Sequence, residues 1–164
     1  MRILLLISML FIQLFCFGQS KLEGSYLNKF GERLVFENDS IFSHTWQFDL
    51  ASSWTKGTYR ISNDTIYLRT TLIYDTLEIV NSENEFIKDS LVVSIDETSN
   101  SIRNEEFVMS LVAGGGQNRL PPPDKLVLVR GKLFRLNKLG IIDKSKKKQT
   151  LTDKSFKTYF FKRN

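Results

Sequence analysis

The residue types that most often carry catalysis or metal binding are scarce in this chain. His44 is its only histidine and Cys16 its only cysteine. His44 could act as the base of a serine nucleophile, but the Gly-x-Ser-x-Gly turn that exposes such a serine is absent. Zinc sites draw on several His or Cys ligands, and no carboxylate spacing typical of a calcium loop occurs. The residue types therefore predict no catalytic set, no metal site and no bound cofactor.

Paired carboxylates and a glycine run are the remaining features with chemical potential. Asp96–Glu97 and Glu105–Glu106 are acidic pairs of the kind that glycosidases use, but such pairs in polar stretches are more typical of a solvated surface. The run Gly114–Gly116 lacks the Lys-Ser/Thr of a phosphate-binding loop, and Pro121–Pro123 prevents the helix that would follow. We therefore predict that the protein is not an enzyme.

The first 18 residues have the features of a secretory signal peptide. A basic start is followed by an apolar stretch over 3–17, which is shorter than the roughly 20 residues of a membrane-spanning helix. Small residues three positions and one position before the Gly18–Gln19 bond predict cleavage there. Residues 19–164 would then form a single domain of a size that can bury a core.

Export would place the protein outside the cytoplasm, away from nucleic acid. The protein would reach the periplasm, the outer membrane surface or the medium, so nucleic acid is not an expected partner. An uncleaved membrane anchor and lipidation of Cys16 are the alternatives, and the bulky Phe15 argues against lipidation. Cleavage after Gly18 would remove the only cysteine, which leaves no disulfide to stabilise the domain.

Charge is unevenly distributed along the chain. Residues 125–164 hold 13 Lys and Arg against two Asp, a net charge of +11, whereas residues 19–124 have a net charge of −7. Four of these basic residues stand close together, namely Lys144, Lys146, Lys147 and Lys148. Such a run predicts a solvated loop that offsets the acidic half, or alternatively contact with an anionic envelope surface.

Runs of β-branched and aromatic residues separated by Asn/Asp turns predict β-hairpins in the middle of the chain. Asp39, Asp64 and Asp89 follow one another at intervals of 25 residues, each with an apolar residue three positions earlier. We interpret this as one hairpin unit written three times. In the third unit the strands would be 85–87 and 91–95.

About ten short strands with almost no helix predict an all-β fold. We expect an antiparallel meander closed as a small barrel or folded as a sandwich, and closure would remove exposed sheet edges. Residues 101–112 are ambiguous, and we expect a short helix that runs into a strand. Residues 113–124 form a long Gly/Pro loop, a kind that is often functional, and its candidate surface contacts are Gln117, Asn118 and Arg119.

Hairpin register predicts which side chains face the interior. In the first unit, a one-residue bulge near Ser40 would place Phe42, His44 and Trp46 inside, with Phe48 a further inner position. A two-residue turn would expose Phe42 and Trp46, and burying each of these gains about 2–3 kcal/mol. In the second unit a turn at Asn63–Asp64 would pair Tyr59 with Leu68.

The N-terminal half resembles lipocalin-like proteins secreted by bacteria. The matching residues are Gly24, Tyr26, Leu34, Val35, Phe36, Asp39, Phe42, Trp54, Gly57, Thr58, Tyr59, Ile61, Asp64, Ile66 and Leu68. The resemblance implies an up-and-down barrel with a cavity for a small apolar ligand. This chain departs from the pattern with Tyr26 in place of Trp, no disulfide and the long loop.

Two functions follow as expectations. In the first, the barrel binds a small apolar ligand through Phe42, His44, Trp46 and Tyr59, with His44 as the polar anchor of the ligand. The alternative role of His44 is that of a hydrogen-bonded core residue. In the second function, the protein has no interior pocket and acts in the envelope through its outer surface. A cavity filled by aromatic side chains would favour the second.

Overall fold

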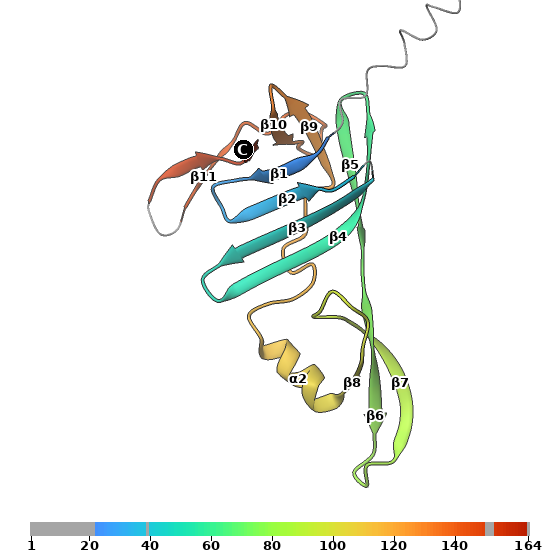
Figure 1. Cartoon of the computed structure of the whole chain (residues 1–164). Coiled ribbons are helices and arrows are strands. Elements are labelled where there is room, and N and C mark those ends of the chain that lie inside the picture. The colour runs from blue at the N-terminus through green and yellow to red at the C-terminus, as the bar shows by residue number, and fades with distance from the viewer. Residues whose placement is uncertain (1–21, 39, 150–152, 164) are drawn as a thin grey trace, which may run out of the picture.

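The computed structural model describes residues 22–38, 40–149 and 153–163. The expected signal peptide, with Cys16, and the turn residue Asp39 lie outside the described residues. Within the described chain, eight antiparallel strands form a closed barrel (Figure 1), which confirms the all-β prediction and selects the barrel over the sandwich. Around the barrel they are β1 (Gly24–Leu27), β13 (Phe160–Lys162), β10 (Lys132–Arg135), β9 (Lys125–Val129), β5 (Thr65–Thr71), β4 (Ala51–Ser62), β3 (Ile41–Phe48) and β2 (Glu32–Phe36).

Two excursions leave the barrel. The first, residues 72–112, is called the arm and projects beyond β5 (Figure 1). It contains β6 (Tyr74–Val80), β7 (Phe86–Val93), β8 (Ser101–Arg103) and α2 (Asn104–Val112), with its strands in the order β7-β6-β8. The second is called the ribbon and pairs β11 (Lys146–Lys148) with β12 (Ser155–Lys157).

The expected registers of the first two hairpins are confirmed. Phe36 lies opposite Phe42 in the β2–β3 pair, as the bulge requires. The Asn38 side chain accepts hydrogen bonds from the backbone N–H groups of Ser40 and Ile41, which accommodates the extra residue. In the β4–β5 pair Tyr59 lies opposite Leu68. Both turn residues there have positive φ, 50° and 60°, as a two-residue hairpin turn demands.

The barrel core is apolar and aromatic toward one end. Its buried members are Leu22, Tyr26, Leu34, Phe36, Phe42, Tyr59, Ile66, Leu126, Leu133 and Phe160. The Phe36 ring packs edge-on against Tyr59, with ring centroids 4.9 Å apart. Gly57 leaves room for the Phe42 ring, because a Cβ at this position would stand 2.8 Å from that ring and 2.1 Å from the Arg69 carbonyl oxygen. Phe42 and Tyr59, which were expected to line a ligand cavity, are both buried members of this cluster.

The prediction of a third hairpin unit over 85–95 was wrong. Phe86–Val93 is one continuous strand, and Asp89 lies within it opposite Glu78 rather than at a turn. The turn lies earlier, over 81–85, where the Asn81 side chain accepts hydrogen bonds from the backbone N–H groups of Glu83 and Glu85. An Asn side chain that accepts hydrogen bonds from the backbone N–H groups after it stabilises a turn directly. The 25-residue interval that predicted a turn at Asp89 involves no such interaction.

The expected order within 101–112 was also wrong, because the strand precedes the helix. β8 pairs in parallel with β6, placing Ile102 beside Leu77. The Glu106 carboxylate then accepts a hydrogen bond from the Arg103 backbone N–H at 2.9 Å, which caps the start of α2. The ribbon differs from expectation too, since Lys146–Lys148 is a strand and not a loop.

Candidate functional site

The barrel changes character toward its second end, where inward positions carry polar side chains. On β2, inward positions run from Phe36 through Leu34 to Glu32, and on β3 from Phe42 to His44. On β4 the buried positions run from Tyr59 and Gly57 to the polar Thr55 and Ser53. The strand period of two residues thus brings these polar groups into one layer of the barrel.

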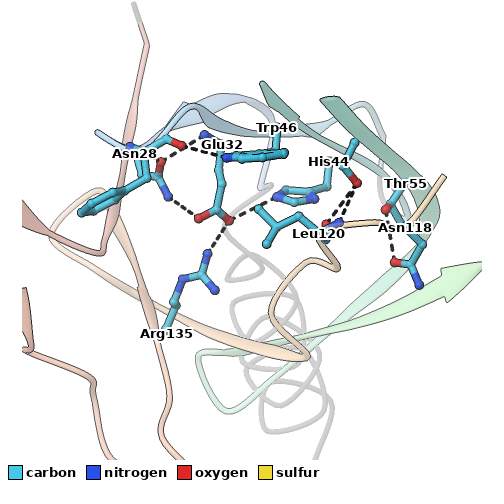
Figure 2. A network of polar contacts seen from close by, with 10 residues as sticks. Asn28, Glu32, His44, Trp46, Thr55, Asn118, Leu120 and Arg135 are labelled. Carbon is cyan, nitrogen blue, oxygen red and sulfur yellow. Dashed lines mark hydrogen bonds and ion pairs between the residues drawn. The ribbon is translucent and has the colours of Figure 1, made fainter. Parts of the chain in front are cut away.

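Glu32 is the centre of this layer (Figure 2). Its Oε1 accepts a hydrogen bond from Asn28 Nδ2 at 2.9 Å, and its Oε2 lies 3.3 Å from His44 Nε2. The same Oε2 forms an ion pair with Arg135 Nη2. The Asn28 side-chain oxygen in turn accepts hydrogen bonds from the backbone N–H groups of Phe30 and Glu32. This connected network offsets the cost of burying a carboxylate.

The environment of Glu32 favours its ionised form. Burial alone raises the pKa of Glu32, but the hydrogen bond with His44, the charge of Arg135 and the hydrogen bond from Asn28 together outweigh it. The pKa of Glu32 therefore lies below its usual 4.5. An ionised Glu32 keeps the nearby Arg135 charge compensated inside the barrel mouth.

His44 is fully buried, which confirms its inward position, and it uses only one of its ring nitrogens. With the proton on Nε2 it donates to Glu32, and Nδ1 has no hydrogen-bond partner among the described residues. Trp46 is half-buried at the barrel rim, where its Nε1–H donates to the Phe30 carbonyl at 3.0 Å. Phe48 was expected inside, but it is 40% exposed and stacks on Trp46, because β3 extends beyond the barrel there.

The long loop seals this end of the barrel. Its backbone runs beside β4, with hydrogen bonds from Ser52 N to Gly114 O at 2.9 Å and from Asn118 N to Trp54 O at 2.8 Å. The Ser53 hydroxyl accepts a hydrogen bond from Leu120 N at 2.9 Å. These contacts cover the edge of β4 that β5 does not reach, so the loop is a structural closure.

The three loop residues expected at the surface have different environments. The prediction that Gln117 lies at the surface was wrong, since this residue is only 7% exposed. Its amide donates to the Ile73 and Ser94 carbonyls and accepts from Ile73 N, because the start of the arm lies against the loop. Asn118 is half-buried and accepts a hydrogen bond from the Thr55 hydroxyl at 3.3 Å. Only Arg119 is exposed.

The four expected ligand residues do not gather around one hollow of the described chain. Phe42 is fully buried in the apolar core. The Tyr59 hydroxyl lies 2.6 Å from the Asn38 carbonyl and 3.0 Å from the Leu22 carbonyl, so it ties down two backbone segments. His44 belongs to the Glu32 network and Trp46 to the rim. Glu32, Asn28 and Arg135 were missed, although the alternation Glu32-x-Leu34-x-Phe36 marks Glu32 as inward-facing.

A hollow of about 220 Å³ opens on the outside, between the barrel wall and the ribbon. It is lined by Lys29, Lys146, Ser155, Phe156, Lys157, Tyr159 and Phe161. The Lys29 ammonium lies 5.5 Å from the centroid of the Phe161 ring, and Lys132 lies 4.8 Å from that of Tyr159. Within the described residues none of the three lining lysines forms an ion pair, and no carboxylate lines the hollow. It presents concentrated positive charge over aromatic rings.

The predicted lysine run lies around this hollow, but only one of its members lines it. All four lysines are exposed. Lys146 lies opposite Lys157 in the ribbon, and both line the hollow. Lys148 is neutralised by Asp153, whose carboxylate lies 2.7 Å from its ammonium. Sequence reasoning missed Lys29 and the aromatic floor, because they come from segments more than a hundred residues apart.

No protein-family model, curated protein or solved structure matches this chain. The lipocalin-like resemblance therefore stays a prediction. No helix within the described ranges is long and apolar enough to cross a membrane. The same described ranges hold no group of three or more His, Cys, Asp and Glu side chains arranged to bind a metal ion.

Proposed function

We propose that the protein is an exported cell-envelope interaction protein that binds anionic groups through its outer surface. The observation that carries this proposal is the hollow between barrel and ribbon, where Lys29, Lys146 and Lys157 converge without carboxylate partners among the described residues. Charges left uncompensated on one face attract ligands of opposite charge. The partner class is an anionic envelope surface, such as acidic lipid headgroups or acidic polysaccharide.

The packing of the barrel supports an outer site over an interior one. Phe36, Phe42 and Tyr59 fill the apolar half, and the Glu32 network occupies the other half. The loop over 113–124 closes the mouth on the β4 side. The outer hollow, in contrast, is open to solvent and reachable by a ligand without rearrangement of the core.

Binding to anionic vesicles tests the proposal. A triple variant, Lys29→Gln with Lys146→Gln and Lys157→Gln, should bind vesicles of mixed acidic and neutral lipid about tenfold more weakly than the parent. The control replaces by Gln three exposed lysines of the basic segment 125–164 that do not line the hollow, Lys138, Lys144 and Lys154. Both triples lose the same charge, so the control should lose less than about twofold if the hollow is the site, a distinction of roughly 1 kcal/mol.

Two results would contradict the proposal. If both triples lose equal affinity, the basic end acts only through its net charge and the hollow is no site. If the parent shows no retention on acidic vesicles or on an acidic polysaccharide at low salt, the protein does not use this face at all. Added salt should weaken true binding, because exposed charges are screened within about 10 Å at 0.1 M.

A second candidate is the binding of a small apolar ligand with a polar head inside the barrel. The observation in its favour is the fully buried His44 Nδ1, which has no partner among the described residues and could accept a hydrogen bond. A fluorescent fatty-acid-like probe tests it. Binding that weakens in His44→Phe while the melting curve is preserved would support this role, and absence of probe binding by the parent would exclude it.

A further inference from the structure

The arm exposes a large amount of apolar surface. On β7, Phe86 is 62% exposed and Leu91 71%, and on α2 Met109 is 68% exposed and Val112 74%. β7 is also the outermost strand of its sheet, so one of its edges has no neighbouring strand in the described chain. Exposed apolar surface on an unprotected edge strand marks a contact site or an aggregation hazard.

The arm is also strongly acidic. Residues 72–112 carry nine Asp and Glu against two basic side chains, a net charge of −7. This equals the net charge of the whole of residues 19–124, so the rest of that region is neutral. Glu78, Glu105 and Glu106 together line a surface hollow between β6, β8 and α2. A partner for this surface must be both basic and partly apolar.

The opposite side of the same molecule has these properties. The ribbon and its flanking segments belong to residues 125–164, which have a net charge of +11. The connection into the ribbon exposes Leu139 by 82% and Ile141 by 60%, and Phe156 and Phe161 line the adjacent hollow. Arm and ribbon project in different directions from the barrel (Figure 1), so one copy cannot easily bring them together, whereas two copies can.

We propose that the arm of one copy docks on the ribbon face of a second copy, so that the chain associates head to tail. The inference rests on the proposed function, because it assigns an acidic protein surface to the same basic face. Attraction between opposite surface charges would orient the encounter. The apolar side chains of the arm and of the ribbon connection would then be buried. Such a contact is heterologous, and repeated copies form a ring or a filament.

Charge argues against the symmetric alternative, in which two arms pair with each other. That arrangement would bring two surfaces of net charge −7 together, and like charges facing each other destabilise an interface. Pairing of two β7 strands about a two-fold axis at Asp89 would also set two carboxylates opposite each other. Arm-to-arm pairing is therefore an outcome that the experiment must be able to detect.

Two variants of the full exported chain test the proposal, one with charges removed from the arm and one with charges removed from the ribbon. The arm variant carries Glu83→Gln and Glu105→Gln, and the ribbon variant Lys146→Gln and Lys157→Gln; all four side chains are exposed. Sedimentation velocity at low salt should show the parent above the mass of one chain, with a return to single chains at about 0.5 M salt, where screening is strong. Each variant alone should associate about fivefold more weakly.

An equimolar mixture of the two variants gives the decisive result. The intact arm of the ribbon variant can dock on the intact ribbon of the arm variant, but the other two faces are weakened. The mixture should therefore form a two-chain species with little growth beyond it. A control that removes the same charge from the barrel, Glu37→Gln with Asp124→Asn, should associate like the parent.

Several outcomes would overturn the inference. A parent protein that remains a single chain at every salt concentration would overturn head-to-tail association. If the ribbon variant nevertheless binds vesicles more weakly than the parent, the proposed function stands without self-association. Stronger association of the arm variant would indicate arm-to-arm pairing that its acidic charge had opposed. Association unchanged at high salt would indicate an apolar contact in which charge is irrelevant. Conversely, an acidic polysaccharide that dissociates the parent assemblies would support a shared basic face.

Discussion

Arg135 and Glu32 form an ion pair inside the barrel although they are 103 residues apart in sequence. Arg135 ends β10 and Glu32 begins β2, and β13 and β1 lie between these strands in the barrel order. The pair therefore spans the interior and fastens the last third of the barrel to its first hairpin. His44 binds the same carboxylate oxygen as Arg135, so one acceptor holds both groups.

Removal of the Glu32 carboxylate should be costly. Glu32→Ala leaves Arg135, His44 and Asn28 without their shared acceptor, and breaking a buried charge pair from one side typically costs about 3–5 kcal/mol. Urea unfolding followed by tryptophan fluorescence measures the loss. Glu37→Ala on the exposed neighbouring turn is the control and should change stability by less than about 0.5 kcal/mol. Equal losses in the two variants would mean that the network contributes nothing specific.

Acid should destabilise the protein through the same carboxylate. The pKa of Glu32 in the folded chain lies below 4.5, the value expected in the unfolded chain, so the unfolded state binds a proton first. The stabilisation is complete above about pH 4.5 and is lost as the pH falls through the lowered pKa. Unfolding free energies measured from pH 6 to pH 3 should fall less steeply in Glu32→Gln than in the parent. An identical slope would show that Glu32 does not titrate as inferred.

Gln117 should anchor the arm to the barrel. Gln117→Ala leaves the Ile73 N–H and the Ser94 carbonyl without their Gln117 partner, whereas the Ile73 carbonyl keeps the Ser94 N–H. An unsatisfied buried group costs about 1–3 kcal/mol. Amide hydrogen exchange should accelerate at Ile73 and through β6 more than in the apolar core. The neighbouring Arg119→Ala, at an exposed position, serves as the comparison and should leave the exchange rates unchanged. Unaltered exchange in Gln117→Ala would refute the anchoring role.

Trp46 should contribute less than a fully buried tryptophan. It is half-buried and keeps one hydrogen bond, to the Phe30 carbonyl, so Trp46→Ala should cost about 2–3 kcal/mol, below the 3–5 kcal/mol typical of core positions. Its stacking partner Phe48 is 40% exposed, and Phe48→Ala should cost about 1 kcal/mol. Thermal melting compares the two. A parent-like melt of Trp46→Ala would mean that the rim contributes nothing to stability.

The N-terminal segment should be removed on export. Because a basic start and a short apolar stretch precede Gly18, we expect the exported protein to begin at Gln19. Intact-mass measurement on protein recovered from the envelope fraction checks this, with the unexported cytoplasmic pool as reference. A mass that retains residues 1–18, or a lipid adduct on Cys16, would contradict the expected cleavage.

Local sequence determined the features that depend on near neighbours. The Asn63–Asp64 turn and the apolar residues around it were enough to predict the register of β4 and β5, because a two-residue turn leaves one pairing. The cost of exposing Phe42 was enough to select the bulge in the first hairpin. Alternation placed His44 inside for the same reason, since strand residues two apart share a face.

Tertiary structure decided what depends on distant segments. The spacing of Asp89 suggested a turn, but pairing with β6 keeps Phe86–Val93 as one strand. The chain turns earlier, at the hydrogen-bonded Asn81. Gln117 belongs to a polar loop, yet the folded arm buries it against Ile73. Closure of β13 on β1 brings Phe161 beside Lys29, and with them the basic hollow. Local propensity cannot predict such contacts, because they arise only when the barrel closes and brings the two ends of the chain together.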